Sequence, residues 1–104
     1  MFKIGTDIVK ISRIESSIKK QSFLNFVYTD NEIKYCKSSQ SFAGLFAAKE
    51  ALVKALECGI DKPLSNYEIL HNEAGAPYFS KFKNSSVSIS HDGDYAMATV
   101  IIWE

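Results

Sequence analysis

The sequence predicts an α+β fold, in which one long helix and shorter N-terminal helices pack on an antiparallel sheet. Three observations support this class. Apolar and polar residues alternate over 2–8, residues 41–58 have the composition of one long helix, and residues 66–103 contain four strand-like runs separated by turn-forming residues. Strands joined by short turns pair antiparallel, and the long helix needs a partner layer to cover its apolar face.

Length and composition fit one globular domain spanning residues 1–104. Of the 104 residues, 46% are hydrophobic and 23% are charged, which excludes fibrous and disordered classes. The formal net charge of zero argues against a generic nucleic-acid binder. No apolar run approaches the roughly 20 residues of a membrane-spanning helix.

The first residues and the cysteines indicate a cytoplasmic protein. Asp7 follows the N-terminus too closely for the apolar region of a signal peptide. Cys36 and Cys58 are too few for a disulfide framework, and we interpret both as buried thiols. We therefore expect a cytoplasmic chain that acts on neither membranes nor nucleic acids.

The opening segment alternates as a strand does. Phe2, Ile4 and Ile8 fall on one face, and Asp7 falls on the other. Asp7 therefore points away from the apolar side of the strand.

Two short helices are expected to follow. Ser12 and Glu15 have the spacing of a capping box, which predicts a helix over 13–20. Thr29 and Glu32 repeat this spacing, and the second helix should run to about residue 37. An apolar patch between them must pack inside; its members are Phe23, Leu24, Phe26 and Val27.

The segment 41–58 is the strongest helix in the chain. Alanines, which favour helix, alternate here with bulky apolar residues at helical spacing. Gly59 stands where a C-terminal cap belongs.

The rest of the chain reads as two hairpins, around the turn-rich residues 72–76 and 91–94. Small residues share a face in each strand of the second hairpin, which would let another backbone approach closely. That backbone is either the alanine-rich helix or a second copy of the chain, and the sequence leaves both open. The expected strands are 66–71, 77–79, 85–90 and 95–103, and the small residues are Ser86, Ser88, Ser90, Ala96 and Ala98.

The zero net charge conceals an asymmetry. Residues 1–20 carry five basic side chains against two acidic ones, a net charge of +3, and residues 21–104 carry seven against ten, a net charge of −3. The basic segment is either a solvated helix surface or a docking face for an acidic partner.

Three places offer residues for chemistry. Asp7 at the end of its strand is either a turn or cap residue or a ligand for a hard cation. Glu50 and Lys54, one helical turn apart, are either a surface ion pair or a site for magnesium beside a phosphate. His91, expected at a hairpin tip, is either a turn residue or a phosphate donor. We interpret His71 as structural.

Together these segments resemble a known family. The blocks are Gly-Thr-Asp-Ile-Val at 5–9, Phe-Ala-Ala-Lys-Glu-Ala at 46–51 followed by Lys54, and Val-Ser-Ile-Ser-His-Asp at 87–92. Their order and content resemble the holo-[acyl-carrier-protein] synthases, the small 4′-phosphopantetheinyl transferases. The resemblance covers nearly the whole chain, and the middle block is its most specific part.

The resemblance implies a reaction. Such enzymes transfer 4′-phosphopantetheine from coenzyme A to a serine of apo-acyl carrier protein, release adenosine 3′,5′-bisphosphate and serve fatty-acid and lipid biosynthesis. By position, Asp7 and Glu50 would be catalytic ligands of Mg²⁺. Lys54 would contact the diphosphate and His91 would lie beside the coenzyme A phosphates, so both would be catalytic and coenzyme A-binding.

The resemblance also implies partners. Carrier proteins are acidic, and Arg13 matches the basic docking position of the family, with Lys19 and Lys20 beside it. The family is typically a homotrimer with active sites between subunits. The base that takes the serine proton is open between a water on the metal and a carboxylate of the carrier protein acting through water.

The chain departs from the family pattern at Leu45, where an arginine often precedes the middle block. Affinity for the nucleotide or the carrier is expected to differ if that arginine contacts them.

Two other classes of function compete with the transferase: a docking module without catalysis, which would need neither Asp7 nor Glu50, and a magnesium-dependent nucleotide hydrolase, which would turn over coenzyme A without a carrier.

Overall fold

In the computed structural model, which describes residues 1–59 and 62–104, one strand and a series of helices precede a run of strands. The elements are β1 (Phe2–Lys10), α1 (Ile11–Ser17), α2 (Gln21–Val27), α3 (Asp30–Tyr35), α4 (Ser39–Leu56), the 3₁₀ helix η1 (Leu64–Asn66), β2 (Ile69–His71), β3 (Pro77–Phe79), β4 (Ser85–Asp92) and β5 (Tyr95–Trp103). This is the predicted α+β class. None of the described helices is long and apolar enough to cross a membrane.

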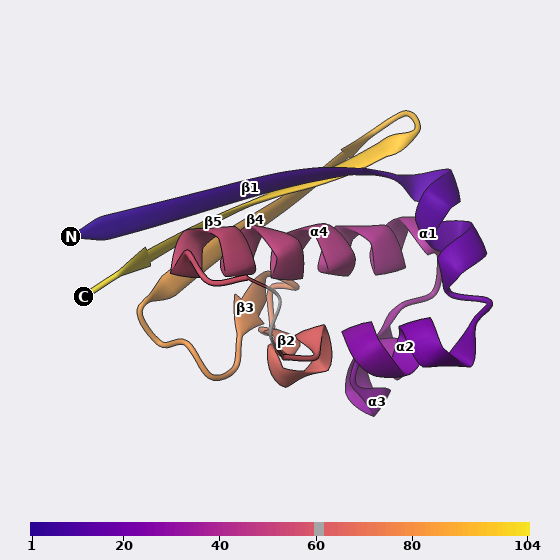
Figure 1. The fold of residues 1–104 in the computed structure, drawn as a ribbon, viewed down its shortest axis with the longest axis horizontal. Helices are drawn as coiled ribbons and strands as arrows, with labels where there is room; N and C mark the ends of the chain where they lie inside the picture. The colour runs from indigo at the N-terminus through magenta and orange to yellow at the C-terminus, as the bar shows by residue number, and fades with distance from the viewer. Residues whose placement is uncertain (60–61) are drawn as a thin grey trace.

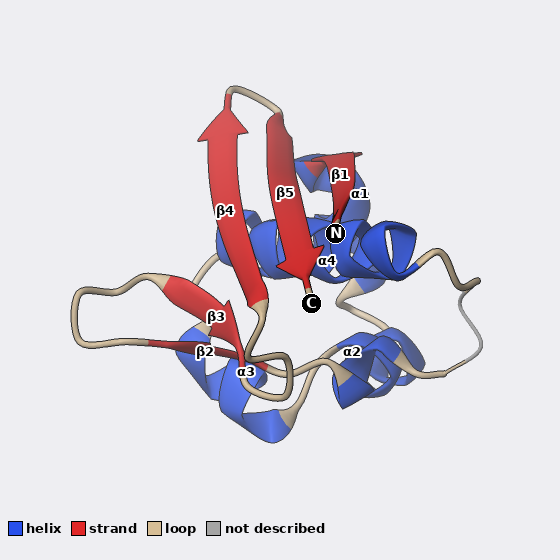
Figure 2. Cartoon of the chain, turned by 90° about the vertical axis from the view of Figure 1, so that its left-hand side faces the viewer, coloured by secondary structure: helices blue, strands red, loops and turns tan. Residues whose placement is uncertain are grey.

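Helix α4 lies between two layers (Figures 1 and 2). A three-stranded antiparallel sheet in the order β1–β5–β4 covers one side of it. Helices α2 and α3 and the two-stranded sheet β2–β3 lie on the other side. Within 43–55, Glu50 and Lys54 are the two residues of α4 that are not buried.

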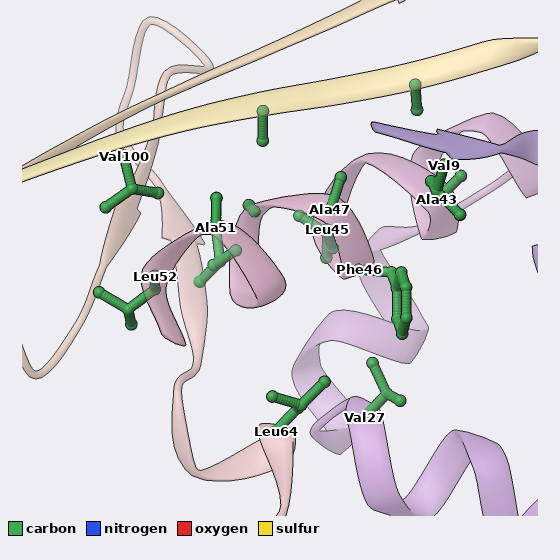
Figure 3. Close-up of a cluster of buried hydrophobic side chains, with 14 of the residues drawn as sticks. Val9, Val27, Ala43, Leu45, Phe46, Ala47, Ala51, Leu52, Leu64 and Val100 are labelled. Atoms are coloured by element: carbon green, nitrogen blue, oxygen red, sulfur yellow. The ribbon is translucent and has the colours of Figure 1, made fainter. Parts of the chain in front are cut away.

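The two covered sides of α4 carry side chains of different size (Figure 3). Ala47 and Ala51 point toward β5, whereas Phe46 points to the opposite side, where Val27 and Leu64 lie. All five are buried. The alanines therefore let the sheet approach the helix closely, and the bulky residues fill the wider space toward α2 and η1.

Strand β1 crosses α4 at a point that only glycine fits. A Cβ atom on Gly5 would lie 2.0 Å from the carbonyl oxygen of Ala51 and 2.8 Å from the backbone nitrogen of Ala55. The missing side chain thus brings the strand directly against the helix backbone. The residues that follow on β1, Thr6 and Asp7, are set beside the last turns of α4 as a result.

The small-residue faces of β4 and β5 lie on opposite sides of the sheet. Ala96 and Ala98 are 0% and 1% exposed and face α4. The backbone that approaches these two alanines closely is therefore that of the helix. Ala98 pairs with Ile89 and Met97 pairs with Ser90, which turns the serines to the outer face. Ser86, Ser88 and Ser90 are exposed there.

The part of the outer face that β1 and β5 form is largely apolar and open. Phe2, Ile4 and Ile8, which the sequence places on one face of the first strand, are 71%, 67% and 65% exposed. Met97 of β5 is paired with Ile8 and is 40% exposed. No described element covers this surface, which we call the outer sheet face.

One predicted capping box is confirmed and the other is wrong. The Thr29 hydroxyl accepts from the Glu32 N–H at 3.2 Å, and the Glu32 carboxylate accepts from the Thr29 N–H at 2.8 Å. By contrast, α1 begins at Ile11, its N-cap is Lys10, and Ser12 lies inside the helix. Strand β1 leads directly into α1, and the Ile11 N–H donates to the Asp94 carbonyl at 2.8 Å, so the turn between β4 and β5 replaces a side-chain cap.

Other boundaries differ as well. The predicted patch at 23–27 is part of α2, in which Val27 is buried and Phe26 is 44% exposed. Helix α4 ends at Leu56, its C-cap is Glu57 with a left-handed φ of 59°, and Gly59 lies two residues beyond this cap.

The C-terminal half follows the predicted hairpins with two changes. Strands β3 and β5 match the expected residues, whereas 66–71 divides into the end of η1 and a shorter β2. Strand β4 continues to Asp92, so His91 lies within a strand, paired with Ala96, and not at the hairpin tip. Cys36 is buried as expected, but Cys58, just beyond α4, is exposed.

Candidate active site

Asp7 and Lys54 meet where β1 lies against α4. The Lys54 ammonium donates to Oδ1 of Asp7 at 3.2 Å and to the Thr6 carbonyl oxygen at 3.0 Å. The Asp7 side chain is 16% exposed and that of Lys54 is 57% exposed. Residues 47 positions apart in sequence therefore form one contact, and it depends on the close strand–helix crossing at Gly5.

Glu50 belongs to the same cluster. It precedes Lys54 by one helical turn, and its pKa is raised from the ordinary value, first by partial burial and then by the Asp7 carboxylate. Lys54 and Arg13 oppose the shift. Two carboxylates thus share a half-buried site with two cations. Lys54 pairs with Asp7, and the helix-surface pair with Glu50 that the sequence allowed is replaced by a contact between elements.

The cluster opens onto a cavity of about 480 Å³, lined by Thr6, Asp7, Ile8, Lys54 and Met97. Its walls come from β1, β5 and α4, and it lies beside the outer sheet face. A ligand in this cavity would contact a carboxylate and an ammonium from the same chain.

The donor set suits Mg²⁺. Magnesium takes oxygen ligands and is usually bound through one or two carboxylates, together with substrate phosphates and water. Asp7 and Glu50 supply two carboxylates, and the charge of Asp7 raises the pKa of Glu50; a cation between them would oppose that shift. Among the described residues no group of three or more His, Cys, Asp or Glu side chains could hold a metal.

His91 lies apart from this cluster. It projects from β4, whereas Asp7 projects from β1, and β5 separates the two strands, a distance of about 10 Å at the usual spacing. His91 faces α4 at Gly44, where an added Cβ would lie 3.2 Å from Nε2. Within one chain, therefore, three of the four predicted catalytic residues lie together, namely Asp7, Glu50 and Lys54. The fourth, His91, lies at the opposite edge of the sheet.

A second cavity of about 200 Å³ surrounds His91. Its other walls come from α3, the first half of α4 and the β2–β3 hairpin. Leu45, which stands in place of the family's arginine, is 3% exposed and forms part of this wall. The lining residues are Tyr35, Ser41, Gly44, Leu45, His71, Gly75, Pro77, Ile89 and His91.

Tyr35 and His71 were not predicted as site residues, yet both line this cavity. Their rings stack at 3.8 Å between centroids with an interplanar angle of 11°. Burial lowers the pKa of His71 from its ordinary value. The two residues come from α3 and β2, so no local spacing in the sequence could have paired them.

The predicted docking residues of the basic segment lie on α1 and in the turn after it. Arg13, Lys19 and Lys20 are all exposed. The positive charge of Arg13 lowers the pKa of Glu50, so Arg13 lies on the side of α1 nearer Glu50. Of the three predicted docking residues, Arg13 is thus the one that is linked electrostatically to the cluster of Asp7, Glu50 and Lys54.

Comparisons with known proteins agree on the family. Residues 3–100 match the family model of the 4′-phosphopantetheinyl transferase superfamily. The holo-[acyl-carrier-protein] synthase of Campylobacter fetus is 43% identical over 95% of this chain and 97% of its own length.

Solved structures agree as well. The Helicobacter pylori holo-[acyl-carrier-protein] synthase in complex with coenzyme A has a TM-score of 0.86 at 38% identity, with 96% of this chain and 99% of that one covered. The Bacillus anthracis enzyme in complex with CoA (3′,5′-ADP) has a TM-score of 0.83 at 31% identity, with 96% and 94% covered. The chain therefore belongs to the 4′-phosphopantetheinyl transferase superfamily, as an enzyme of the holo-[acyl-carrier-protein] synthase group.

Proposed function

We propose that this chain transfers the 4′-phosphopantetheine group from coenzyme A to a serine of apo-acyl carrier protein, with Mg²⁺ held by Asp7 and Glu50. The products are holo-acyl carrier protein and adenosine 3′,5′-bisphosphate. The observation that carries the proposal is the contact of Asp7 with Lys54 beside Glu50, because it joins two of the three sequence blocks in one open site. The relatives that are named for this activity, and solved with coenzyme A, support it.

The reaction is a displacement at phosphorus. The serine oxygen bonds to the β-phosphorus of coenzyme A, and the bond from that phosphorus to the bridging oxygen breaks. The bridging oxygen leaves with adenosine 3′,5′-bisphosphate, and the serine proton passes to water or to a carboxylate of the carrier protein. When bound, Mg²⁺ supplies Lewis-acid stabilisation of the phosphoryl oxygens.

The chain's own residues orient the diphosphate and neutralise its charge. The Lys54 ammonium is held by the Thr6 carbonyl and by Asp7, so little reorganisation is needed before it can meet the developing negative charge. Alignment of the serine with the leaving oxygen supplies much of the remaining acceleration in phosphoryl transfer.

The active site is proposed to be shared between subunits of a homotrimer. His91 lies on the opposite edge of the sheet from Asp7, so a second chain could supply it to the cluster of the first. The outer sheet face is apolar, exposed and continuous with the cavity beside Asp7. Exposed apolar patches of this kind mark protein–protein interfaces.

The substitution Ile4→Glu tests this assembly. A carboxylate among the exposed apolar residues of β1 should convert the trimer to monomers in sedimentation velocity and abolish transfer, since each site would lose His91 of its neighbour. Phe26→Glu is the matched control, because Phe26 is also an exposed apolar residue but lies on α2. A wild-type chain that is fully active as a monomer would contradict the shared site.

The basic segment is proposed to bind the acidic carrier protein. Lys19 and Lys20 give the cleanest test, because Arg13 also acts on Glu50. Lys19→Glu or Lys20→Glu should raise KM for the carrier by up to about fivefold each, as expected for exposed ion pairs worth about 0.2–1 kcal/mol. The effect should shrink at high salt, and KM for coenzyme A should not change. Lys81→Glu, on an exposed loop, is the control. An equal rise in KM for the carrier there would contradict the assignment of the basic segment as the docking face.

Product release distinguishes the transferase from its competitors. Coenzyme A, Mg²⁺ and the protein should yield adenosine 3′,5′-bisphosphate, measured by chromatography, only when an apo carrier is present. Release without a carrier would identify a hydrolase. A carrier that binds without any release would identify a docking module.

The free thiols of Cys36 and Cys58 fit a reducing compartment, and the proposal places the reaction in the cytoplasm.

A further inference from the structure

Lys49 and Glu32 form a buried ion pair that the proposed reaction does not use. Their side chains are 0% and 1% exposed, and Nζ of Lys49 lies 2.6 Å from Oε1 of Glu32. The same ammonium donates to the Val27 carbonyl at 2.6 Å and lies 5.6 Å from the centre of the Tyr28 ring. Lys49 therefore points into the core, while its neighbour Glu50 points to the metal site.

The Glu32 carboxylate joins further segments. Oε1 also accepts from the Thr29 N–H at 2.8 Å, and Oε2 accepts from the Ile69 N–H at 2.8 Å. The pair thus ties the end of α2, the start of α3, strand β2 and helix α4 to one another. No buried side-chain nitrogen or oxygen among the described residues lacks a partner, so this network is complete.

The two elements that Glu32 connects, α3 and β2, also carry the stacked rings of Tyr35 and His71. Tyr35 follows Glu32 by three residues on α3, and His71 follows Ile69 by two residues on β2, with its ring against Tyr35. His71 in turn pairs with Pro77 of β3, which lines the same cavity as His91. The carboxylate of Glu32 therefore holds the two elements whose rings form one wall of that cavity.

Stability alone gives little reason for such a pair. Taking two charges out of water is costly, and apolar residues of similar volume often serve as well or better. The pair instead fixes the relative positions of the segments that it joins, because each of its hydrogen bonds holds one backbone segment against α4.

We propose that Lys49 and Glu32 are positioning residues, which set the Tyr35–His71 stack and through it the shape of the cavity around His91 that receives coenzyme A. The role of this cavity rests on the proposed function. The pair acts through the stack and touches no substrate itself.

Glu32→Gln tests the proposal with readouts that a purely structural role would not move. The glutamine amide cannot accept the Lys49 and Ile69 hydrogen bonds together. We expect the His71 ring-proton resonances, shifted by the stacked Tyr35, to move toward their values in the unfolded chain. The chain has two histidines, and His71→Asn assigns the signals. The Kd for coenzyme A, measured by calorimetry, should rise on the order of tenfold, as on loss of other orienting partners.

Two further variants separate position from stability. Lys49→Met with Glu32→Gln removes both charges and keeps an acceptor for Ile69, so it should recover part of the coenzyme A affinity; the part not recovered reflects the lost Lys49 bond to the Val27 carbonyl. Ile14→Ala empties a buried site on α1, away from the hairpin, and should lower the unfolding midpoint without moving the His71 signals or the Kd. The proposal is overturned if Glu32→Gln lowers the midpoint but leaves the Kd for coenzyme A at the wild-type value.

The outcomes also separate this proposal from the proposed function. A wild-type chain that does not bind coenzyme A would refute the proposed function. The His71 resonances would then still decide whether Glu32 sets the stack, because they need no ligand. Unchanged resonances in Glu32→Gln would refute the positioning role in either case.

Discussion

Asp7→Asn and Glu50→Gln are each expected to lower magnesium-dependent transfer by about 10²–10⁴-fold while the chain stays folded. Lewis-acid stabilisation by a bound metal is worth several kcal/mol, and each 1.36 kcal/mol changes the rate tenfold. Both substitutions keep the size of the side chain and remove one anionic ligand. The half-saturating Mg²⁺ concentration should rise together with the loss of rate.

Folding should be little affected by either change. The Lys54 side chain is 57% exposed, so loss of its pair with Asp7 costs little stability. Glu50→Gln removes a carboxylate whose ionisation burial and Asp7 already disfavour. Glu57→Gln is the matched control, since Glu57 lies two turns beyond Glu50, is exposed and pairs only with the surface residue Lys3 among the described contacts. Full activity in either site variant at limiting Mg²⁺ would show that the ligand assignment is wrong.

Gly5→Ala should destabilise the fold and disable the site together. The added methyl group would overlap the Ala51 carbonyl oxygen, and that atom belongs to the helix backbone and cannot turn aside. Overpacking of this kind costs about 1–3 kcal/mol or more, which for about 100 residues lowers Tm by roughly 4–8 °C per kcal/mol. Movement of β1 away from α4 would also separate Asp7 from Lys54 and Glu50, so transfer should fall at temperatures where the variant is folded.

The same substitution at Gly59 is the control. Among the described residues other than its chain neighbours, no atom would lie within 4 Å of a Cβ on Gly59, so Gly59→Ala should leave Tm and transfer near the wild-type values. Thermal unfolding by circular dichroism and transfer rates at low temperature measure both effects. A Gly5→Ala chain with wild-type Tm and rate would show that the strand–helix crossing does not set the site.

Sequence reasoning succeeded where the signal is local. The alanine-rich pattern of α4, the capping box at Thr29 and the turn between β4 and β5 each depend on neighbouring residues, and each is present. The errors concern element boundaries that local sequence signals did not determine. The Asp94 carbonyl replaces the cap expected from Ser12, Glu57 caps α4 before Gly59, and β4 extends past Ser90 so that His91 becomes a strand residue.

The site shows the same division. The blocks indicated Asp7, Glu50 and Lys54, but the contact of Asp7 with Lys54 depends on the glycine crossing, which no spacing reveals. The sequence assigns no role to Lys49, one residue before Glu50. Its burial follows from the position of Glu32 across the core, so its role is visible only in three dimensions.

The most direct test of the account is the mass of the carrier protein. Apo-acyl carrier protein incubated with this chain, coenzyme A and Mg²⁺ should gain the mass of one 4′-phosphopantetheine, as measured on the intact carrier by mass spectrometry. The gain should be absent when the acceptor serine is replaced by alanine or when Mg²⁺ is chelated. A wild-type chain that is folded and yet leaves the mass of every tested apo carrier unchanged would contradict the account.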